Sequence, residues 1–332
     1  MSPLESAVAG PAHAVGVGDA FDAMTGVVLA HGASGDVPPE LTVPRLFTAW
    51  TFDPWLALVV LSAAGLHLAG VRALRRRGDR WPLSRTVLFL VPGLGSVVLA
   101  TQSSLATYDT TLLSVHMVQH MVLSMAAPVF LALGAPITLA LRTLPRSPRR
   151  RLLAVVHSRA ARVLSFPLLA GAVFVVTPFA LYFSGWYPAT LRSDYLHEAL
   201  HLHFLLFGCL WFWPLLGLDP VPNRLAYPMR MLAIFVTLPF HAWLGITIMS
   251  ASDIIGQQWY GSLGRDWGPG LLDDQQTAGG ILWVTGDLVG LVLFAALFVQ
   301  WVRASEREAE REDRRLDRLE AEAARAARRP GP

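Results

Sequence analysis

Seven long apolar segments constrain the fold of this 332-residue chain more than any other feature. A helix needs about 20 mostly apolar residues to cross the hydrocarbon core of a bilayer. The chain is 53% hydrophobic and only 15% charged, too apolar for an ordinary soluble domain. We therefore predict an all-α polytopic membrane protein with seven transmembrane helices. The expected spans are roughly residues 53–72, 85–102, 111–133, 165–184, 195–216, 229–251 and 277–301.

The third span is interrupted toward its end. Its apolar character continues to Leu141, but Pro128, Gly134 and Pro136 lie on the way. Proline removes a backbone donor and clashes with the preceding helical turn, so we expect a kink or a short re-entrant tail here.

The arginines predict the orientation. All 27 basic residues are arginines, and they concentrate in the loops 72–85 and 142–162 and around Arg224 and Arg230. Cytoplasmic loops carry an excess of basic residues, so the amino terminus is expected outside and the carboxyl terminus inside. Beside apolar segments these arginines fit contacts with anionic lipids, whereas nucleic-acid binding is not expected.

Three regions follow from this arrangement. Residues 1–52 form an extracytoplasmic tail, residues 53–302 the seven-helix membrane domain, and residues 303–332 a charged cytoplasmic helix or tail. The last region alternates arginines with acids and lacks a heptad seam, which favours a solvated helix.

Six histidines are expected in the outer half of the membrane. With a rise of ~1.5 Å per residue, they fall roughly 3 to 15 Å below the outer ends of three different spans. A single buried histidine is more often a packing residue than a ligand, but ionisable side chains that share one depth favour a functional site. The six are His116, His120, His197, His201, His203 and His241.

The types of ligand at these positions favour copper. His116 and His120 are four residues apart and share a helix face, as do His197 and His201, whereas His203 points about 120° away from His197. Thioethers are soft ligands, so Met117 and Met121 beside the first pair favour Cu(I) over Cu(II). The alternative is that these methionines only fill gaps between helices.

The stretch HEALH, residues 197–201, has the spelling of a zinc protease motif. Such a site needs a third ligand at the same depth, with Glu198 as general base. Asp219 lies about 27 Å along the helix from His201 and cannot supply it, whereas Asp287 on the last span is at a suitable level. A membrane metalloprotease is therefore one alternative. A haem-binding electron carrier that pairs His120 with His203 or His241 is another.

Four linked stretches resemble the CtaG family of bacterial cytochrome c oxidase assembly factors. They are HMVQHMVLSMAAPVFLALGAP (116–136), HFLLFGCLWFWPLLGLDPVP (203–222), PFHAWLGITIMS (239–250) and DQQTAGGILWVTGDL (274–288). The resemblance covers roughly residues 47–301. It implies a seven-helix protein of the bacterial plasma membrane with an extracytoplasmic copper role, in which His116, His120, His203 and His241 are the favoured ligands.

These observations together predict an assembly chaperone without enzymatic turnover. It would bind or deliver copper while a copper-containing terminal oxidase matures, with oxidase subunits and an extracytoplasmic copper donor as partners. Asp287 either orients a ligand histidine by accepting its second ring proton or serves a polar contact between helices.

Overall fold

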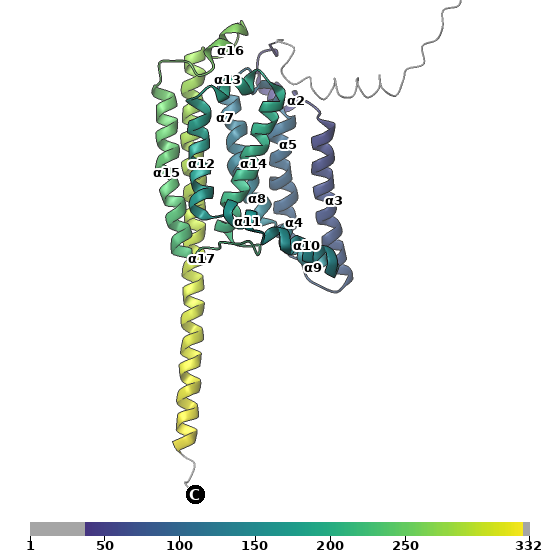
Figure 1. The fold of residues 1–332 in the computed structure, drawn as a ribbon, viewed down its shortest axis with the longest axis vertical. Helices are drawn as coiled ribbons and strands as arrows, with labels where there is room; N and C mark the ends of the chain where they lie inside the picture. The colour runs from purple at the N-terminus through teal and green to yellow at the C-terminus, as the bar shows by residue number, and fades with distance from the viewer. Residues whose placement is uncertain (1–36, 328–332) are drawn as a thin grey trace, which may run out of the picture.

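The computed structural model describes residues 37–327, which form helices and connecting loops without any strand (Figure 1). The expected all-α fold is confirmed, and the part of the predicted amino-terminal tail before residue 37 lies outside the described residues. The helices are α2 (Val43–Thr48), α3 (Pro54–Arg76), α4 (Leu83–Leu88), α5 (Gly95–Gln102), α6 (Ser104–Tyr108), α7 (Leu113–Met121), α8 (Ala127–Leu133), α9 (Pro136–Thr143), α10 (Arg146–Val156), α11 (Arg159–Leu164), α12 (Pro167–Tyr182), α13 (Trp186–Leu191), α14 (Asp194–Leu216), α15 (Tyr227–Ser250), α16 (Gln257–Ser262) and α17 (Leu271–Ala327).

Six helical segments in the described residues are long and apolar enough to cross a membrane. They make the chain a multi-pass membrane protein. The segment expected at 165–184 forms α12, which is apolar but only 16 residues long. The other six are α3, Leu83–Tyr108, Leu113–Thr143, α14, α15 and α17.

Two π-helical turns interrupt these segments. The turn η1 (Phe89–Leu94) contains Pro92, and η2 (Val122–Ala126) ends just before Pro128. A proline removes one backbone hydrogen bond, and a π turn lets the helix continue around that loss. The expected irregularity of the third span is thus present as η2 and as a break at Ala135, which separates α8 from α9 in a left-handed conformation.

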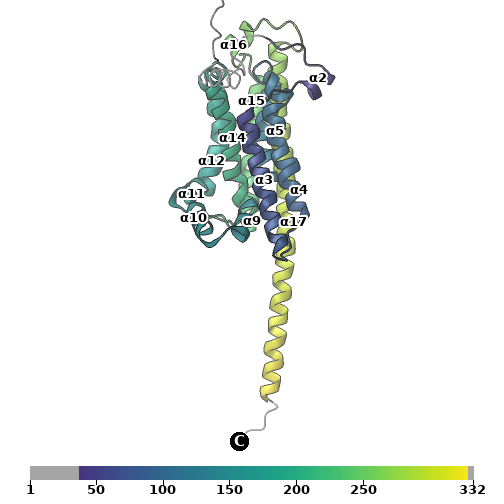
Figure 2. The ribbon, with the colours of Figure 1, turned by 90° about the vertical axis from the view of Figure 1, so that its right-hand side faces the viewer.

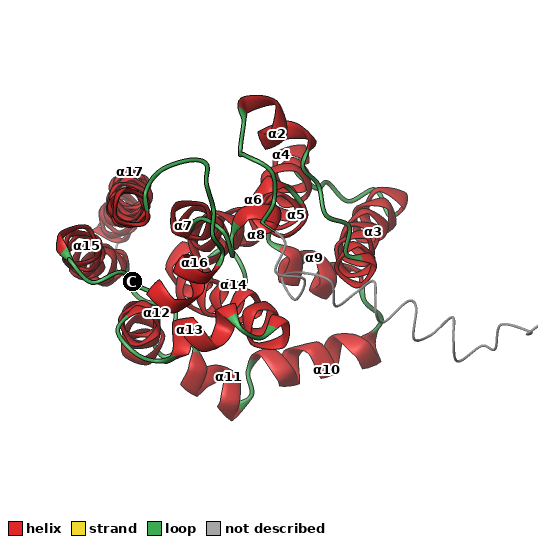
Figure 3. Cartoon of the chain, turned by 90° about the horizontal axis from the view of Figure 1, so that it is seen from above, coloured by secondary structure: helices red, strands yellow, loops and turns green. Residues whose placement is uncertain are grey.

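The helices α7 and α14 lie inside the bundle, with α3 at one edge and α15 at the opposite edge (Figure 3). The short helices α13 and α16 lie at one end, called here the upper end, and α10 and α11 lie across the lower end (Figures 1 and 2). Close packing of α14 on η2 depends on Gly208, because a Cβ there would lie 2.2 Å from the carbonyl oxygen of Ser124.

One buried carboxylate holds each end of the segment from Leu113 to Thr143. At the upper end Asp274 of α17 accepts the backbone N–H of Leu113 at 2.6 Å and also bonds the hydroxyl of Ser114. At the lower end Asp219 accepts the backbone N–H of Thr138 at 2.7 Å and the indole N–H of Trp213 at 2.9 Å. The backbone donors of Leu113 and Thr138 lie in the first turns of α7 and α9, where they have no partner within the helix, and these carboxylates satisfy them.

The last helix continues far beyond the bundle. α17 is a single helix of 57 residues, and its charged part leaves the lower end as an extended rod (Figure 2). Ion pairs between neighbouring turns, such as Arg314 with Glu310 at 3.7 Å, lie on its exposed surface. Such pairs support an isolated helix only weakly.

Candidate metal centre

Four histidines from two helices meet near the upper end of the bundle. Ring centroids of His116 and His120 on α7 lie 3.9 Å apart, and those of His197 and His201 on α14 lie 4.5 Å apart. Between the helices, His116 lies 5.5 Å from His197 and His120 lies 6.5 Å from His201. All four are buried. The spacing of four residues places each pair on one helix face, so the two faces form one site. We call these four residues the histidine cluster.

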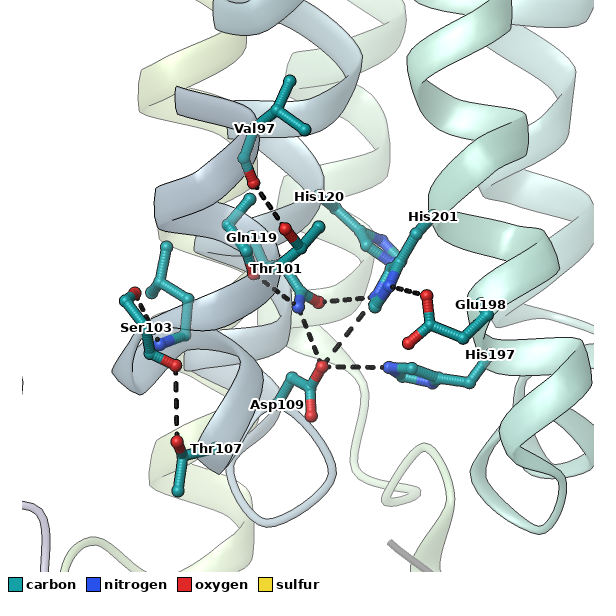
Figure 4. A network of polar contacts seen from close by, with 12 residues as sticks. Val97, Thr101, Ser103, Thr107, Asp109, Gln119, His120, His197, Glu198 and His201 are labelled. Atoms are coloured by element: carbon teal, nitrogen blue, oxygen red, sulfur yellow. Dashed lines mark hydrogen bonds and ion pairs between the residues drawn. The ribbon is translucent and has the colours of Figure 1, made fainter. Parts of the chain in front are cut away.

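A buried carboxylate completes this group. Asp109 lies in the turn between α6 and α7, and its Oδ2 accepts hydrogen bonds from Nε2 of His197 at 3.0 Å and from the Gln119 amide at 2.8 Å (Figure 4). The amide oxygen of Gln119 in turn accepts from Nε2 of His201 at 2.9 Å. Burial raises the pKa of the Asp109 carboxyl, but the imidazoles of His197 and His201 and the amide of Gln119 together outweigh burial and hold the pKa below its ordinary value.

Several ring nitrogens of the cluster are buried without hydrogen-bond partners among the described residues. His116 is 0% exposed, and neither its Nδ1 nor its Nε2 has a partner. Nε2 of His120 and Nδ1 of His197 are in the same condition, and Nδ1 of His201 has only the Glu198 carboxylate, 3.6 Å away. Leaving a buried polar atom unpaired costs on the order of 1–3 kcal/mol, so these nitrogens are suited to binding a ligand.

The donor set fits a transition-metal ion. Asp109, His197 and His201 each offer one ligand atom, and these atoms lie within 4.8 Å of one another. Imidazole nitrogen suits copper, zinc, iron and nickel alike, and one carboxylate adds a harder donor. An ion here would take the place of the ring protons that now point at Asp109 and Gln119.

Glu198 contacts this group only at His201, from the side of the ring away from Asp109. Its side chain is 56% exposed, and Oε2 lies 3.6 Å from Nδ1 of His201, the nitrogen on the far side of the ring from Asp109. A carboxylate in that place orients a ligand histidine. A general base would have to face a metal-bound water.

The remaining predicted ligands line a separate small cavity of about 30 Å³ between α7, α12, α14 and α15. His203 on α14 faces Thr177 of α12, with its Nε2 3.3 Å from the Thr177 hydroxyl. The cavity contains His120, His203 and His241 with Met117 and Met121, so only His120 belongs to both groups. The structure thus divides the eight predicted ligands into two groups.

Asp287 lies beside this second group without a hydrogen bond to a histidine in the described chain. Its Oδ2 accepts from the indole of Trp283 at 2.8 Å, and its Oδ1 is buried without a partner. The neighbouring Gly286 lets the ring of His241 approach α17, because a Cβ there would lie 2.9 Å from that ring. Whether Asp287 orients a ligand stays a prediction.

Sequence reasoning missed three residues of these sites: Asp109, Gln119 and Tyr182. Asp109 lies between two predicted spans, where an acidic residue is unremarkable by itself. Gln119 lies within the stretch HMVQH. A glutamine inside an apolar span indicates a polar contact in the bundle interior, so this residue could have been predicted. Tyr182, whose hydroxyl lies 2.9 Å from Nδ1 of His120, comes from α12 near the end of an apolar run and carries no such signal.

The fold and this site define a multi-pass helical membrane protein with a buried group of imidazoles and a carboxylate. Residues 65–304 match the model of the family described as cytochrome c oxidase caa3 assembly factor. The chain belongs to this family, which confirms the resemblance found in its motifs.

Relatives of the chain are found in mycobacteria. Proteins of Mycobacterium bovis and Mycobacterium tuberculosis, each described as uncharacterized, are 38% identical over 289 residues, which is 85% of this chain and 44% of the relative. One from Mycobacterium leprae is 35% identical over the same length. The chain therefore spans less than half the length of these relatives. No solved structure matches it.

Proposed function

We propose that the protein is a cytochrome c oxidase assembly factor that holds copper at the histidine cluster and passes it to the maturing oxidase. The observation that carries this proposal is His116, a fully buried imidazole with no hydrogen bond to a described residue, whose ring lies 3.9 Å from that of His120 and 5.5 Å from that of His197. Copper coordination would satisfy these nitrogens. Ligands that hydrogen-bond when no metal is present, as His197 and His201 do, suit an ion that must be released again.

The proposed topology places the cluster on the extracytoplasmic side of the bacterial plasma membrane. In this arrangement α12 serves as the seventh span, the amino terminus lies outside and the carboxyl terminus lies inside. The distribution of arginine supports it, because α10 carries Arg146, Arg149, Arg150 and Arg151 at the lower end, where α17 also leaves the bundle. Anionic lipids are the expected partners of that end.

No turnover chemistry is part of this proposal. The orientation of Glu198 away from Asp109 speaks against a protease, although Asp109 would supply the third ligand that such an enzyme needs. A cavity of about 30 Å³ has room for one water or ion, which speaks against a bound haem. In Glu198→Gln the amide oxygen can still accept a hydrogen bond from Nδ1 of His201, so the variant should keep its bound copper. Neither the variant nor the wild type should cleave peptides.

The direct test measures copper and oxidase maturation together. The full chain is purified in detergent and its copper content is determined by elemental analysis, while oxidase activity is measured in membranes of cells that carry the same variant. His116→Ala should lower both. His157→Ala is the matched control, because His157 is an exposed histidine at the end of α10. Unchanged copper and unchanged oxidase activity in His116→Ala would refute the proposal.

A further inference from the structure

The small cavity beside His120 differs in chemistry from the site around Asp109. Its metal-binding side chains are three imidazoles, from His120, His203 and His241, and two thioethers, from Met117 and Met121. No aspartate or glutamate lines it. Thioether ligands select soft cations, whereas carboxylates suit harder ones. The cavity therefore favours a soft cation more strongly than the site around Asp109 does, whereas only the latter also suits a harder ion.

Hydrogen bonds leave two ring nitrogens free to bind a cation in the cavity. Nδ1 of His241 lies 3.2 Å from the carbonyl oxygen of Thr237, which only accepts, so Nδ1 carries the proton and Nε2 keeps its lone pair. His120 is fixed in the same tautomer. Its Nδ1 donates to the Tyr182 hydroxyl, and that hydroxyl donates to the sulfur of Met117 at 3.7 Å. The opposite arrangement would bury an unpaired N–H at Nε2 of His120, the more costly outcome.

The size of the cavity matches a single ion. A site needs about 10–15 Å³ to hold one water, and this cavity offers about 30 Å³. Aromatic rings line it, with Phe204 only 4.2 Å from the ring of His120 and Phe174 5.5 Å from that of His241. An apolar site with neutral donors favours a monovalent cation over a divalent one, because less charge is desolvated.

We propose that this cavity is a second metal site, selective for a soft monovalent cation such as Cu(I), and that it shares His120 with the histidine cluster. The inference rests on the proposed function, because copper would bind first at the histidine cluster and then move to the cavity. An ion moves between them by ligand exchange at His120, one donor leaving as another binds. Cu(I) stays Cu(I) throughout, so no reductant or oxidant takes part.

The test uses silver and zinc ions on the detergent-purified full chain, with bound metal measured by equilibrium dialysis and elemental analysis. Ag(I) replaces Cu(I) as the probe because it is also a soft monovalent cation but is not oxidised under these conditions. The wild type should bind two silver ions, one at each site with His120 serving one of them at a time, but only one zinc ion, because the cavity offers no anionic ligand to offset the desolvation of a divalent cation. His203→Ala with His241→Ala should remove one silver and leave zinc binding unchanged. Asp109→Asn with His197→Ala should remove zinc and one silver.

A conservative variant covers the case in which the double alanine variant fails to fold. Met121→Leu keeps the side-chain volume, which usually costs under about 1.5 kcal/mol. X-ray absorption of bound silver should show sulfur neighbours in the wild type and fewer in Met121→Leu. Met229→Leu is the matched control, because Met229 is an exposed methionine of α15.

The outcomes separate this inference from the proposed function. A single silver ion that depends on Asp109 and not on His203 or His241, with no sulfur neighbours, would overturn the second site and leave the first standing. Silver that depends only on His203 and His241, together with no copper or zinc at the cluster, would overturn the proposed function and leave the cavity site.

Discussion

The hydroxyl of Tyr182 lies 2.9 Å from Nδ1 of His120 and 3.7 Å from the sulfur of Met117. One phenol on α12 therefore links a histidine and a methionine of α7. It leaves Nε2 of His120, the nitrogen shared by both candidate sites, without a proton.

Removal of this hydroxyl should weaken metal binding more than it weakens the fold. We expect Tyr182→Phe to lower copper affinity roughly 10-fold, the lower end of the effect of losing a partner that orients a ligand. The loss of one hydrogen bond should cost about 1 kcal/mol of stability. Competition titration with a Cu(I) chelator and thermal unfolding measure the two effects. Tyr195→Phe, at an exposed tyrosine of α14, should change neither, and equal affinities for all three proteins would contradict the role given to Tyr182.

Asp109 should contribute to metal affinity through its negative charge. Asp109→Asn keeps the shape and can still accept from Gln119 and His197, but it removes the carboxylate from the donor set. We expect zinc affinity, measured by isothermal titration, to fall at least ~10-fold, as for other metal-site partners. The control is Asp253→Asn on an exposed loop near the upper end. Full zinc affinity in Asp109→Asn would mean that the carboxylate is not a ligand.

Close packing at Gly208 should make α14 sensitive to a single methyl group. Gly208→Ala places its Cβ 2.2 Å from the backbone oxygen of Ser124, so α14 must move away from η2. We expect a loss of about 1–3 kcal/mol, measured by thermal unfolding in detergent. At Gly65 of α3 a Cβ would meet nothing within 4 Å, so Gly65→Ala should be neutral or stabilising. Equal melting of the two variants would refute this packing argument.

Asp219 should be a structural residue rather than a ligand. In Asp219→Ala the backbone N–H of Thr138 and the indole N–H of Trp213 lose their acceptor. Each buried donor left unpaired costs on the order of 1–3 kcal/mol, so the melting temperature should fall clearly. The metal content of protein that remains folded should be unchanged. Asp313→Ala, on the exposed part of α17, is the control, and loss of metal from folded Asp219→Ala would contradict this assignment.

Much of the fold was predictable because membrane spans are a matter of length and apolarity. The predicted span at 195–216 differs from α14 by one residue, and that at 229–251 differs from α15 by two at its start and one at its end. The helix α12 is shorter than expected, since it begins at Pro167, a residue favoured in the first helical turn, and ends at Tyr182. That boundary is local, and hydropathy alone does not locate it.

The sequence could predict most residues of the candidate site but not which of them lie together. Helical rise places the histidines at a common level, but it does not say which faces of α14 meet which neighbours. Nearly every position of that helix is apolar, so periodicity could not assign the two faces that carry His201 and His203. Asp109 was out of reach for a different reason: it enters the site from a turn, and the direction of a turn side chain depends on tertiary contacts.

The bond between Asp274 and the start of α7 has a mechanical consequence. Asp274 lies in the first turn of α17, and the same unbroken helix continues to the opposite face of the protein and beyond it. A helix transmits axial displacement along its whole length. Through Asp274, α17 is therefore in contact both with the start of α7, next to the turn that carries Asp109, and with whatever meets its charged part at the opposite end of the bundle.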